Sequence, residues 1–424
     1  MCGINGIYRL PDIEKAKTLM VSMNKSLSHR GPDDEGVYSD NDITLGHRRL
    51  SIIDLSAAGH QPMLSHDNRY VIVYNGELYN FREIKAQLKS YPFKTNTDTE
   101  VILAAYSAWG ADCLNKFNGM YAFAIWDKNE KKLFIARDRL GIKPLYYFQR
   151  ENTLIFSSEL RALMQSGLVP KRLNREGLVD YLRYQTVHAP QTIIKDVKML
   201  LPGHYMTYDD KGVGDVKKYW QAGENINKSI GEKPYEEICN DVKSLLFASV
   251  ERRLVADVPF GAFLSGGIDS SAVVGIMSKV SNSKVNSFSV VFDEQEFSEA
   301  KYSRMVAKRF NTDHHEIQLK ISDFMAELPS AMKSLDHPSG DGLNTYVVSK
   351  ATKNAGITMA LSGLGGDELF AGYAVFKRML KLGNYSWISS LPKGLREQAG
   401  NLLRGVRPGV SSDKSAALIG LDDL

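Results

Sequence analysis

The segment Ser265–Ser271 constrains the fold of this chain more than any other feature, because two adjacent glycines in it join an apolar run to a helical pattern. The apolar run covers residues 259–264, and the helical pattern covers residues 270–280. Glycines at such a junction let the backbone approach an anion without a Cβ in the way. Amide groups at a helix N-terminus, together with serine hydroxyls, suit phosphate oxygens. The segment therefore predicts a strand, a phosphate-binding turn and a helix; a plain strand–turn–helix junction is the alternative.

The rest of the second half alternates between short apolar runs and helical patterns. Further apolar runs cover residues 285–292 and 357–361, a short strand is predicted at residues 314–319, and a helical pattern covers residues 299–310. This alternation predicts a Rossmann-like parallel sheet with helices on both faces. Ligands of such sheets bind beyond the carboxyl ends of the strands, where a second glycine-rich turn, residues 361–368, also falls. That turn contains Asp367 and Glu368, and Mg²⁺ prefers such oxygen ligands.

The first half is dominated by short segments rich in β-branched and aromatic residues. Such segments cover residues 70–74, 120–126, 132–136 and 145–148, and their composition favours strands. Helical spacing is found over residues 13–27 and again from Thr97 to Tyr106. This half is therefore predicted to form sheets that pack together and are covered by helices. A polar, turn-rich stretch then predicts three parts: a domain at 1–205, a linker at 206–234 and a domain at 235–424.

Composition excludes several classes of protein. The chain is 43% hydrophobic and 24% charged, as is usual for a globular protein, and its net charge of +4 comes from interspersed residues rather than a basic stripe. Three cysteines are too few for a disulfide framework and form no CxxC pair. No stretch approaches the ~20 apolar residues that span a bilayer, and no leader precedes Cys2. We expect a cytoplasmic protein with neither a nucleic-acid nor a membrane partner.

Cys2 is a candidate nucleophile because it follows the initiator methionine. Removal of Met1 would give a chain that begins with a thiol and a free amine. That amine has an ordinary pKa of roughly 7.7–8.0 and can accept the thiol proton near neutral pH. An inert terminal cysteine is the alternative.

Several further segments give Cys2 a context. Cys2-Gly3-Ile4, the segment 29–33 (HRGPD), the segment 49–52 (RLSI) and Asn75-Gly76-Glu77 together resemble the class II glutamine amidotransferase domain over residues 1–200. The resemblance implies an N-terminal-nucleophile fold, with two sheets sandwiched between helices. It also implies that Cys2 attacks the glutamine amide, while Asn75 and Gly76 form the oxyanion hole. The glutamine-binding residues that it implies are Arg49, Leu50, Ser51, Ile52, Ile53, Asn75, Gly76, Glu77 and Asp98, with Arg49 on the α-carboxylate and Glu77 and Asp98 on the α-amino group.

Structural alternatives exist for several of these residues. The segment 29–33 could be only a helix stop and turn. Arg49 could be a surface salt-bridge residue, and Asn75-Gly76 could be a type I′ hairpin turn. His314-His315-Glu316 resembles a metal cluster, but adjacent strand residues point to opposite faces, so we expect it to be structural.

The two glycine-rich turns resemble the SGGxDS loop of ATP-pyrophosphatases, the PP-loop family, and the SGxGxDE turn of asparagine synthetases. The resemblance implies that ATP is cleaved between its α and β phosphates to adenylate a carboxylate. Asp269 and Asp367 would hold Mg²⁺. The ATP-binding residues that it implies are Leu264, Ser265, Gly266, Gly267, Asp269, Ser270, Val290, Ser362 and Gly363.

In this order the two halves resemble the glutamine-hydrolysing asparagine synthetases over nearly the whole chain. The resemblance implies that aspartate, ATP and glutamine yield asparagine, glutamate, AMP and pyrophosphate, and that homodimers are common. Two departures leave alternatives open. Leu364 stands where these enzymes often have a glutamate, and only residues 367–424 follow Gly366. The second departure predicts either a truncated product or an incomplete acceptor side of the pocket. The acceptor could therefore be another carboxylate, such as a sugar uronic acid, or the chain could only hydrolyse glutamine or bind nucleotide.

Overall fold

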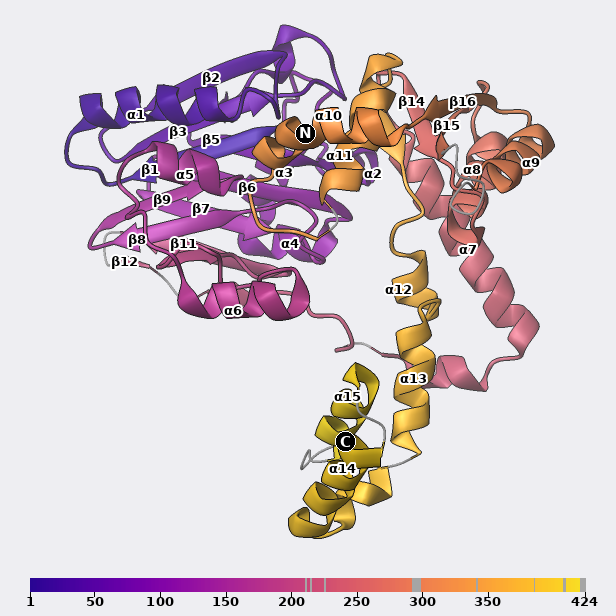
Figure 1. The fold of residues 1–424 in the computed structure, drawn as a ribbon. Coiled ribbons are helices and arrows are strands. Elements are labelled where there is room, and N and C mark those ends of the chain that lie inside the picture. The colour runs from indigo at the N-terminus through magenta and orange to yellow at the C-terminus, as the bar shows by residue number, and fades with distance from the viewer. Residues whose placement is uncertain are drawn as a thin grey trace.

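The computed structural model in Figure 1 describes residues 1–209, 212–213, 216–224, 226–291, 299–340, 342–384, 386–406 and 409–419. Two antiparallel sheets form its first unit. The first has the order β10–β8–β9–β1–β3–β2, and the second has the order β12–β11–β7–β6–β5–β4, with β13 paired to β11. Their bounds are β1 Gly3–Tyr8, β2 Asp34–Ser39, β3 Ile43–Arg49, β4 Met63–Leu64, β5 Tyr70–Leu78, β6 Gly119–Asp127, β7 Lys132–Arg137, β8 Tyr146–Arg150, β9 Thr153–Ser157, β10 Val197–Met199, β11 His204–Asp209, β12 Gly212–Val213 and β13 Lys217–Lys218.

Helices cover the outer face of each sheet, so the first unit has four layers. α1 (Ile13–Ser26) and α5 (Leu160–Gln165) share a core with the first sheet. The helices α2 (Phe81–Gln87), α3 (Asp98–Trp109) and α4 (Cys113–Lys116) share another with the second sheet. A third core lies between the two sheets. This arrangement confirms the sandwich predicted for the first half; α6 (Arg175–Tyr184) lies beside it.

β5 shows how alternation in the sequence builds these layers. Val71 and Val73 point into the core between the sheets, whereas Ile72 and Tyr74 point toward the helices. β5 also continues beyond the predicted end at residue 74: Asn75 pairs with Ala122 of β6, and pairing extends to Leu78. The hairpin-turn interpretation of Asn75-Gly76 is therefore wrong, because both residues lie inside β5 and pair with β6.

The second unit is a parallel sheet in the order β16–β15–β14–β17, as the alternating pattern predicted. Its strands are β14 Phe260–Phe263, β15 Asn286–Val291, β16 Asp313–Gln318 and β17 Met359–Leu361. One core joins this sheet to α7 (Tyr235–Arg253), α8 (Ile268–Val280) and α9 (Ala300–Phe310). The helices α10 (Ile321–Ser334) and α11 (Gly342–Asn354) pack against each other and lie toward the first unit (Figure 1).

Four short helices end the described chain: α12 (Gly366–Phe370), α13 (Ala374–Gly383), α14 (Lys393–Val406) and α15 (Val410–Ile419). Of the expected linker 206–234, the strands β11, β12 and β13 pair within the second sheet of the first unit, and residues 210, 211, 214, 215 and 225 lie outside the described ranges. No helix in the described ranges is long and apolar enough to cross a bilayer.

Candidate functional site

Cys2 lies directly before β1, with its thiol at the end of β3. The backbone N–H of Leu50 donates to Cys2 Sγ over 3.4 Å. Burial raises the pKa of the Cys2 thiol, and it lowers the pKa of the Met1 amino group to about 5. Both shifts favour the uncharged forms, so the Met1 amine is unprotonated at neutral pH.

An arginine–glutamate network holds the main chain of Cys2. Arg30 Nε donates to the carbonyl oxygen of Cys2 over 2.9 Å, and Arg30 Nη1 donates to Glu159 Oε1 over 2.9 Å. The carboxylate of Glu159 also lies 3.0 Å from His29 Nε2. Although burial opposes it, these partners hold the pKa of Glu159 below its ordinary value. The segment 29–33 is therefore more than a helix stop, because it positions the residue that carries the thiol.

Arg49 organises the loop that follows β3. The residue is only 6% exposed, so the interpretation as a surface salt-bridge residue is wrong. Its guanidinium donates to the carbonyl oxygens of Ser56, over 2.8 Å, and of Ile53 and Asp54. Gly59 lies so close beneath the guanidinium that a Cβ there would overlap it. The loop 50–56 is thus folded around Arg49.

Asn75 offers hydrogen-bonding groups that the described protein does not use. Its side chain is fully buried, and neither Nδ2 nor Oδ1 has a partner among the described residues. Buried amides of this kind are rare unless a ligand completes them. Gly76 follows on the same strand, where a Cβ would lie 2.8 Å from the Tyr121 Cα.

Two acidic residues lie close to Cys2. Burial raises the pKa of Glu77 to about 7, with Lys143 opposing that shift. Burial also raises the pKa of Asp98, whose Oδ2 accepts hydrogen bonds from the Tyr74 hydroxyl over 2.8 Å and from the Leu78 N–H over 2.9 Å. The charge of Asp98 acts on the Cys2 thiol, and that of Glu77 acts on the terminal amine.

Sequence reasoning missed two residues of this site. Lys143 is 4% exposed and its charge acts on both Cys2 and Glu77. It follows a turn in which the carboxylate of Asp138 accepts from the N–H groups of Leu140, Ile142 and Lys143 itself. Glu159 is the other. The Asp-Arg-Leu-Gly turn signal at 138–141 could have indicated Lys143, whereas nothing local indicated Glu159.

The second candidate site lies at the carboxyl end of β14. Gly266 has φ +91°, and a Cβ on it would lie 2.5 Å from the Tyr302 Cβ of α9. Ser265 Oγ accepts from the N–H of Gly267 over 3.2 Å and lies 2.9 Å from Ser270 Oγ. The turn is therefore compact, with the N-terminus of α8 behind it, as a phosphate site requires.

The second glycine-rich turn packs directly on the first. A Cβ on Gly363 would lie 2.7 Å from the Ser270 N, and one on Gly366 would overlap the Asp269 carboxylate. Asp367 follows Gly366 in the chain, and its carboxylate lies against Gly372. Among the described residues no group of three or more His, Cys, Asp or Glu side chains could hold a metal. Two carboxylates still fit Mg²⁺, which commonly binds one or two of them together with substrate phosphates.

Other expected residues take varied places. Leu264 is 1% exposed and packs in the core, so its contact with a nucleotide would involve its main chain. Val290 lies near the end of β15, and the Leu364 side chain is 85% exposed. His314 Nδ1 lies 2.9 Å from Ser287 Oγ, His315 stacks on Phe288 and Glu316 pairs with Arg304, in accordance with the structural role expected for them.

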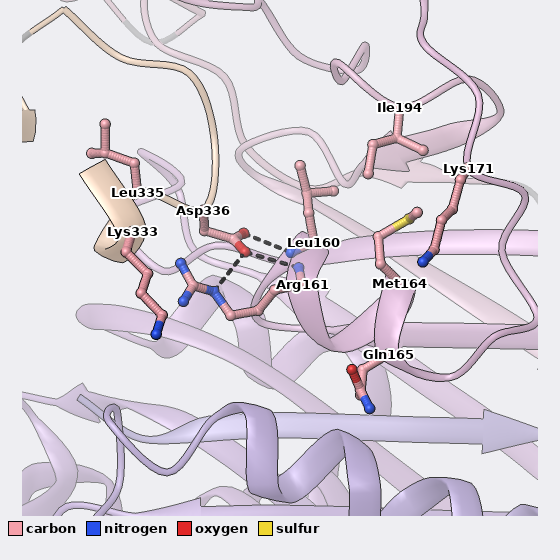
Figure 2. Close-up of a pocket in the computed structure, with 9 residues that line it drawn as sticks. All are labelled: Leu160, Arg161, Met164, Gln165, Lys171, Ile194, Lys333, Leu335 and Asp336. Atoms are coloured by element: carbon pink, nitrogen blue, oxygen red, sulfur yellow. Dashed lines mark hydrogen bonds and ion pairs between the residues drawn. The ribbon is translucent and has the colours of Figure 1, made fainter. Parts of the chain in front are cut away.

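A groove lies where the two units meet. Figure 2 shows Asp336, which follows α10, directed at the N-terminal end of α5. Its carboxylate accepts from the N–H groups of Leu160 over 2.6 Å and Arg161 over 2.8 Å. Burial raises the pKa of Asp336. The groove is lined by Leu160, Arg161, Met164, Gln165, Lys171, Ile194, Lys333, Leu335 and Asp336.

Each half of the chain matches a known protein family. The glutamine amidotransferase domain family matches residues 1–220, and the asparagine synthase family matches residues 241–419. The chain is 40% identical to putative asparagine synthetase [glutamine-hydrolyzing] 2 of Methanocaldococcus jannaschii, over 93% of this chain and 79% of that one. It is 36% identical to asparagine synthetase [glutamine-hydrolyzing] 1 of Bacillus subtilis, over 96% and 64%. It is also 34% identical to amidase chyE of Penicillium rubens, over 88% and 58%.

Proposed function

Because the chain belongs to the family of glutamine-hydrolysing asparagine synthetases, we propose that it is a glutamine-dependent ligase that forms asparagine from aspartate and ATP. The chain spans less than two thirds of the Bacillus subtilis relative, so each step below belongs to this proposal. We place the boundary between the units after β13, between the two matched segments.

Glutamine hydrolysis begins at Cys2. Once Met1 is removed, the α-amine of Cys2 takes the thiol proton, and the thiolate attacks the glutamine side-chain amide. The developing oxyanion is stabilised by the Asn75 amide and the Gly76 N–H. Arg49 holds the substrate carboxylate, and Glu77 and Asp98 hold its ammonium group. Ammonia leaves, and water then releases glutamate from the thioester.

The second unit activates the acceptor. The turn 265–267 and the N-terminus of α8 hold ATP phosphates, and the acceptor carboxylate attacks the α-phosphate to form an acyl-adenylate and pyrophosphate. Mg²⁺ bound by Asp269 and Asp367 would neutralise charge on the departing pyrophosphate. Ammonia then attacks the acyl carbon, and AMP leaves as the amide forms.

The unpartnered, fully buried amide of Asn75 is the observation that carries the glutaminase assignment. A donor with no partner among the described residues, on the strand that also carries Glu77, is what an oxyanion hole provides. For the synthetase step, the support is the packing of the second glycine-rich turn against Asp269 and Ser270.

One observation favours a second candidate acceptor. Leu364 is exposed beside the phosphate-binding turn, and its side chain cannot take a proton from ammonia. An acceptor other than aspartate, such as a sugar uronic acid, is therefore the alternative, and glutamine hydrolysis or nucleotide binding without synthesis is a third. The homodimer and the cytoplasmic location expected from the resemblance stay predictions.

One assay separates these candidates. The purified chain is incubated with ATP, glutamine and single candidate acids while pyrophosphate, glutamate and amide are followed. Aspartate-dependent pyrophosphate release supports asparagine synthesis, and release with only a sugar acid supports the second candidate. Glutamate without pyrophosphate supports the third. Cys2→Ala should abolish glutamine use and keep synthesis from added ammonia; equal loss with both nitrogen donors contradicts the division of labour between the units.

A further inference from the structure

The second unit contacts the loop 50–56 through residues 253–257, which run from the last residue of α7 into the connection to β14. Asp257 Oδ2 accepts from the N–H of Asp54 over 2.8 Å, and the N–H of Asp257 donates to the carbonyl oxygen of Ile52 over 2.9 Å. These two hydrogen bonds fall on either side of Ile53. Asp257 therefore binds the middle of the loop 50–56, which is also the loop folded around Arg49.

The same segment contacts the first unit at two further places. Val255 and Ile53 both pack against the core beneath the second sheet. The guanidinium of Arg253 lies 4.5 Å from the ring centroid of Tyr79, and its charge opposes the rise that burial causes in the pKa of Glu77. The side chains of Arg253, Val255 and Asp257 therefore all contact the first unit near the candidate glutamine site.

Two side chains hold the main chain of the loop through different groups. Arg49 donates to the carbonyl oxygens of Ile53 and Ser56. The carboxylate of Asp257 accepts from the N–H of Asp54. Removal of that carboxylate would free the loop at the point where Arg49 depends on its carbonyls for orientation, because a guanidinium fork is positioned by the acceptors around it.

We propose that Asp257 is a positioning residue for glutamine, supplied to the first unit by the second. This inference rests on the proposed glutaminase activity. By fixing Ile52 and Asp54, Asp257 orients Arg49 toward the substrate carboxylate. Asp257 lies three residues before β14, and β14 leads to Ser265. The residue that contacts the loop 50–56 and the phosphate turn therefore belong to one continuous segment.

The test compares Asp257→Ala and Asp257→Asn with the wild-type chain. Loss of one hydrogen bond to the loop should raise KM for glutamine by about 3- to 10-fold in Asp257→Ala, with kcat for glutamate release little changed. Asp257→Asn keeps an acceptor oxygen and should lie close to wild type. Asp323→Ala removes an exposed carboxylate of α10 and serves as the matched control.

Alkylation of Cys2 by iodoacetamide separates positioning from unfolding. Its rate should be the same in all four proteins, because Asp257 makes no contact with the thiol. A wild-type KM in Asp257→Ala overturns the inference, as does an Asp257→Asn variant that is as impaired as Asp257→Ala. A parallel fall in alkylation rate would show a collapsed site and also overturns it. Wild-type protein that releases no glutamate contradicts the proposed function instead.

Discussion

Asn75 shows how one unsatisfied side chain can indicate chemistry. An amide that is buried without a partner costs free energy, typically about 1–3 kcal/mol, so it persists only where another requirement outweighs that cost. Asn75 lies on β5 opposite Ala122 of β6, beyond the part of β5 that pairs with β4, and no described group is a partner for its side-chain amide. Stabilisation of an oxyanion is such a requirement.

Asn75→Ala should lower kcat for glutamine hydrolysis by about 100- to 1,000-fold, the usual effect of removing one oxyanion donor. KM should change little, because the donor acts mainly on the transition state. The unfolding temperature should not fall greatly, since the amide has no partner to lose within the part of the chain that the structure describes. Steady-state glutamate release and thermal unfolding measure both effects. A loss of less than tenfold would contradict the assignment.

Glu77 predicts a dependence on pH. Burial raises its pKa to about 7, so the side chain is neutral below that pH and negatively charged above it. An ammonium group is bound by the charged form. The kcat/KM for glutamine, which reports the free enzyme, should therefore rise with pH through about 7.

Glu77→Gln is the matched control for that profile. It should lower kcat/KM by about 10- to 100-fold at high pH and remove the rise near neutrality, because the amide does not titrate. The rate of iodoacetamide alkylation reports titration of Cys2 separately. If the variant keeps the wild-type rise, the titrating group is not Glu77.

At the scale of elements, the phosphate turn depends on the approach of α9 to β14. Gly266 combines a positive φ with close contact to Tyr302 and Ser303. Its neighbour Gly267 has φ −67°, and a Cβ there would lie 3.4 Å from Ser265 Oγ. The two adjacent glycines therefore meet different requirements. Gly266 allows the positive φ and the close approach of α9, whereas Gly267 leaves space beside the turn.

Gly266→Ala should destabilise the second unit by about 1–2 kcal/mol from backbone conformation alone, with the contact to α9 adding to it. Gly267→Ala should be tolerated in urea unfolding. Both variants should keep glutamate release, and Gly266→Ala should lose pyrophosphate formation. Equal stability of the two alanine variants would contradict this account of the turn.

At the scale of the whole molecule, a polar network runs from the seam between the units to Cys2. The carboxylate of Asp336 binds the start of α5, and Arg161 lies within 3.2 Å of Asp336 and 2.9 Å of Glu159. Glu159 in turn holds Arg30, which binds the carbonyl oxygen of Cys2. The contact between the two units therefore helps to hold the main chain of Cys2 in place.

Asp336→Ala should weaken this seam by about 1–3 kcal/mol, because two buried N–H groups lose their acceptor. Limited proteolysis should cleave the segment between α10 and α11 faster, and urea unfolding should begin at a lower concentration. Asp336→Asn retains one acceptor oxygen and should be intermediate. Unchanged proteolysis in Asp336→Ala would show that the contact adds nothing to docking.

The sequence by itself determined the elements and their layers. Alternation in β5 separates Val71 and Val73 from Ile72 and Tyr74, and Gly266-Gly267 marks the turn before α8. These features are readable because a period of two and a glycine pair follow from local backbone geometry. For the same reason the local motifs around Cys2 and around Ser265 each predict a functional site at that place in the chain.

Only the tertiary structure decided which distant residues support those sites. Glu159 reaches His29 and Arg30 across about 130 residues, and Asp257 reaches Asp54 across 203. Asn75-Gly76 carries a turn signal in sequence, yet pairing with β6 keeps both residues in a strand. Such contacts depend on how whole sheets and units pack. The packing energy is a sum of small contributions from many residues, so no local sequence pattern reveals it.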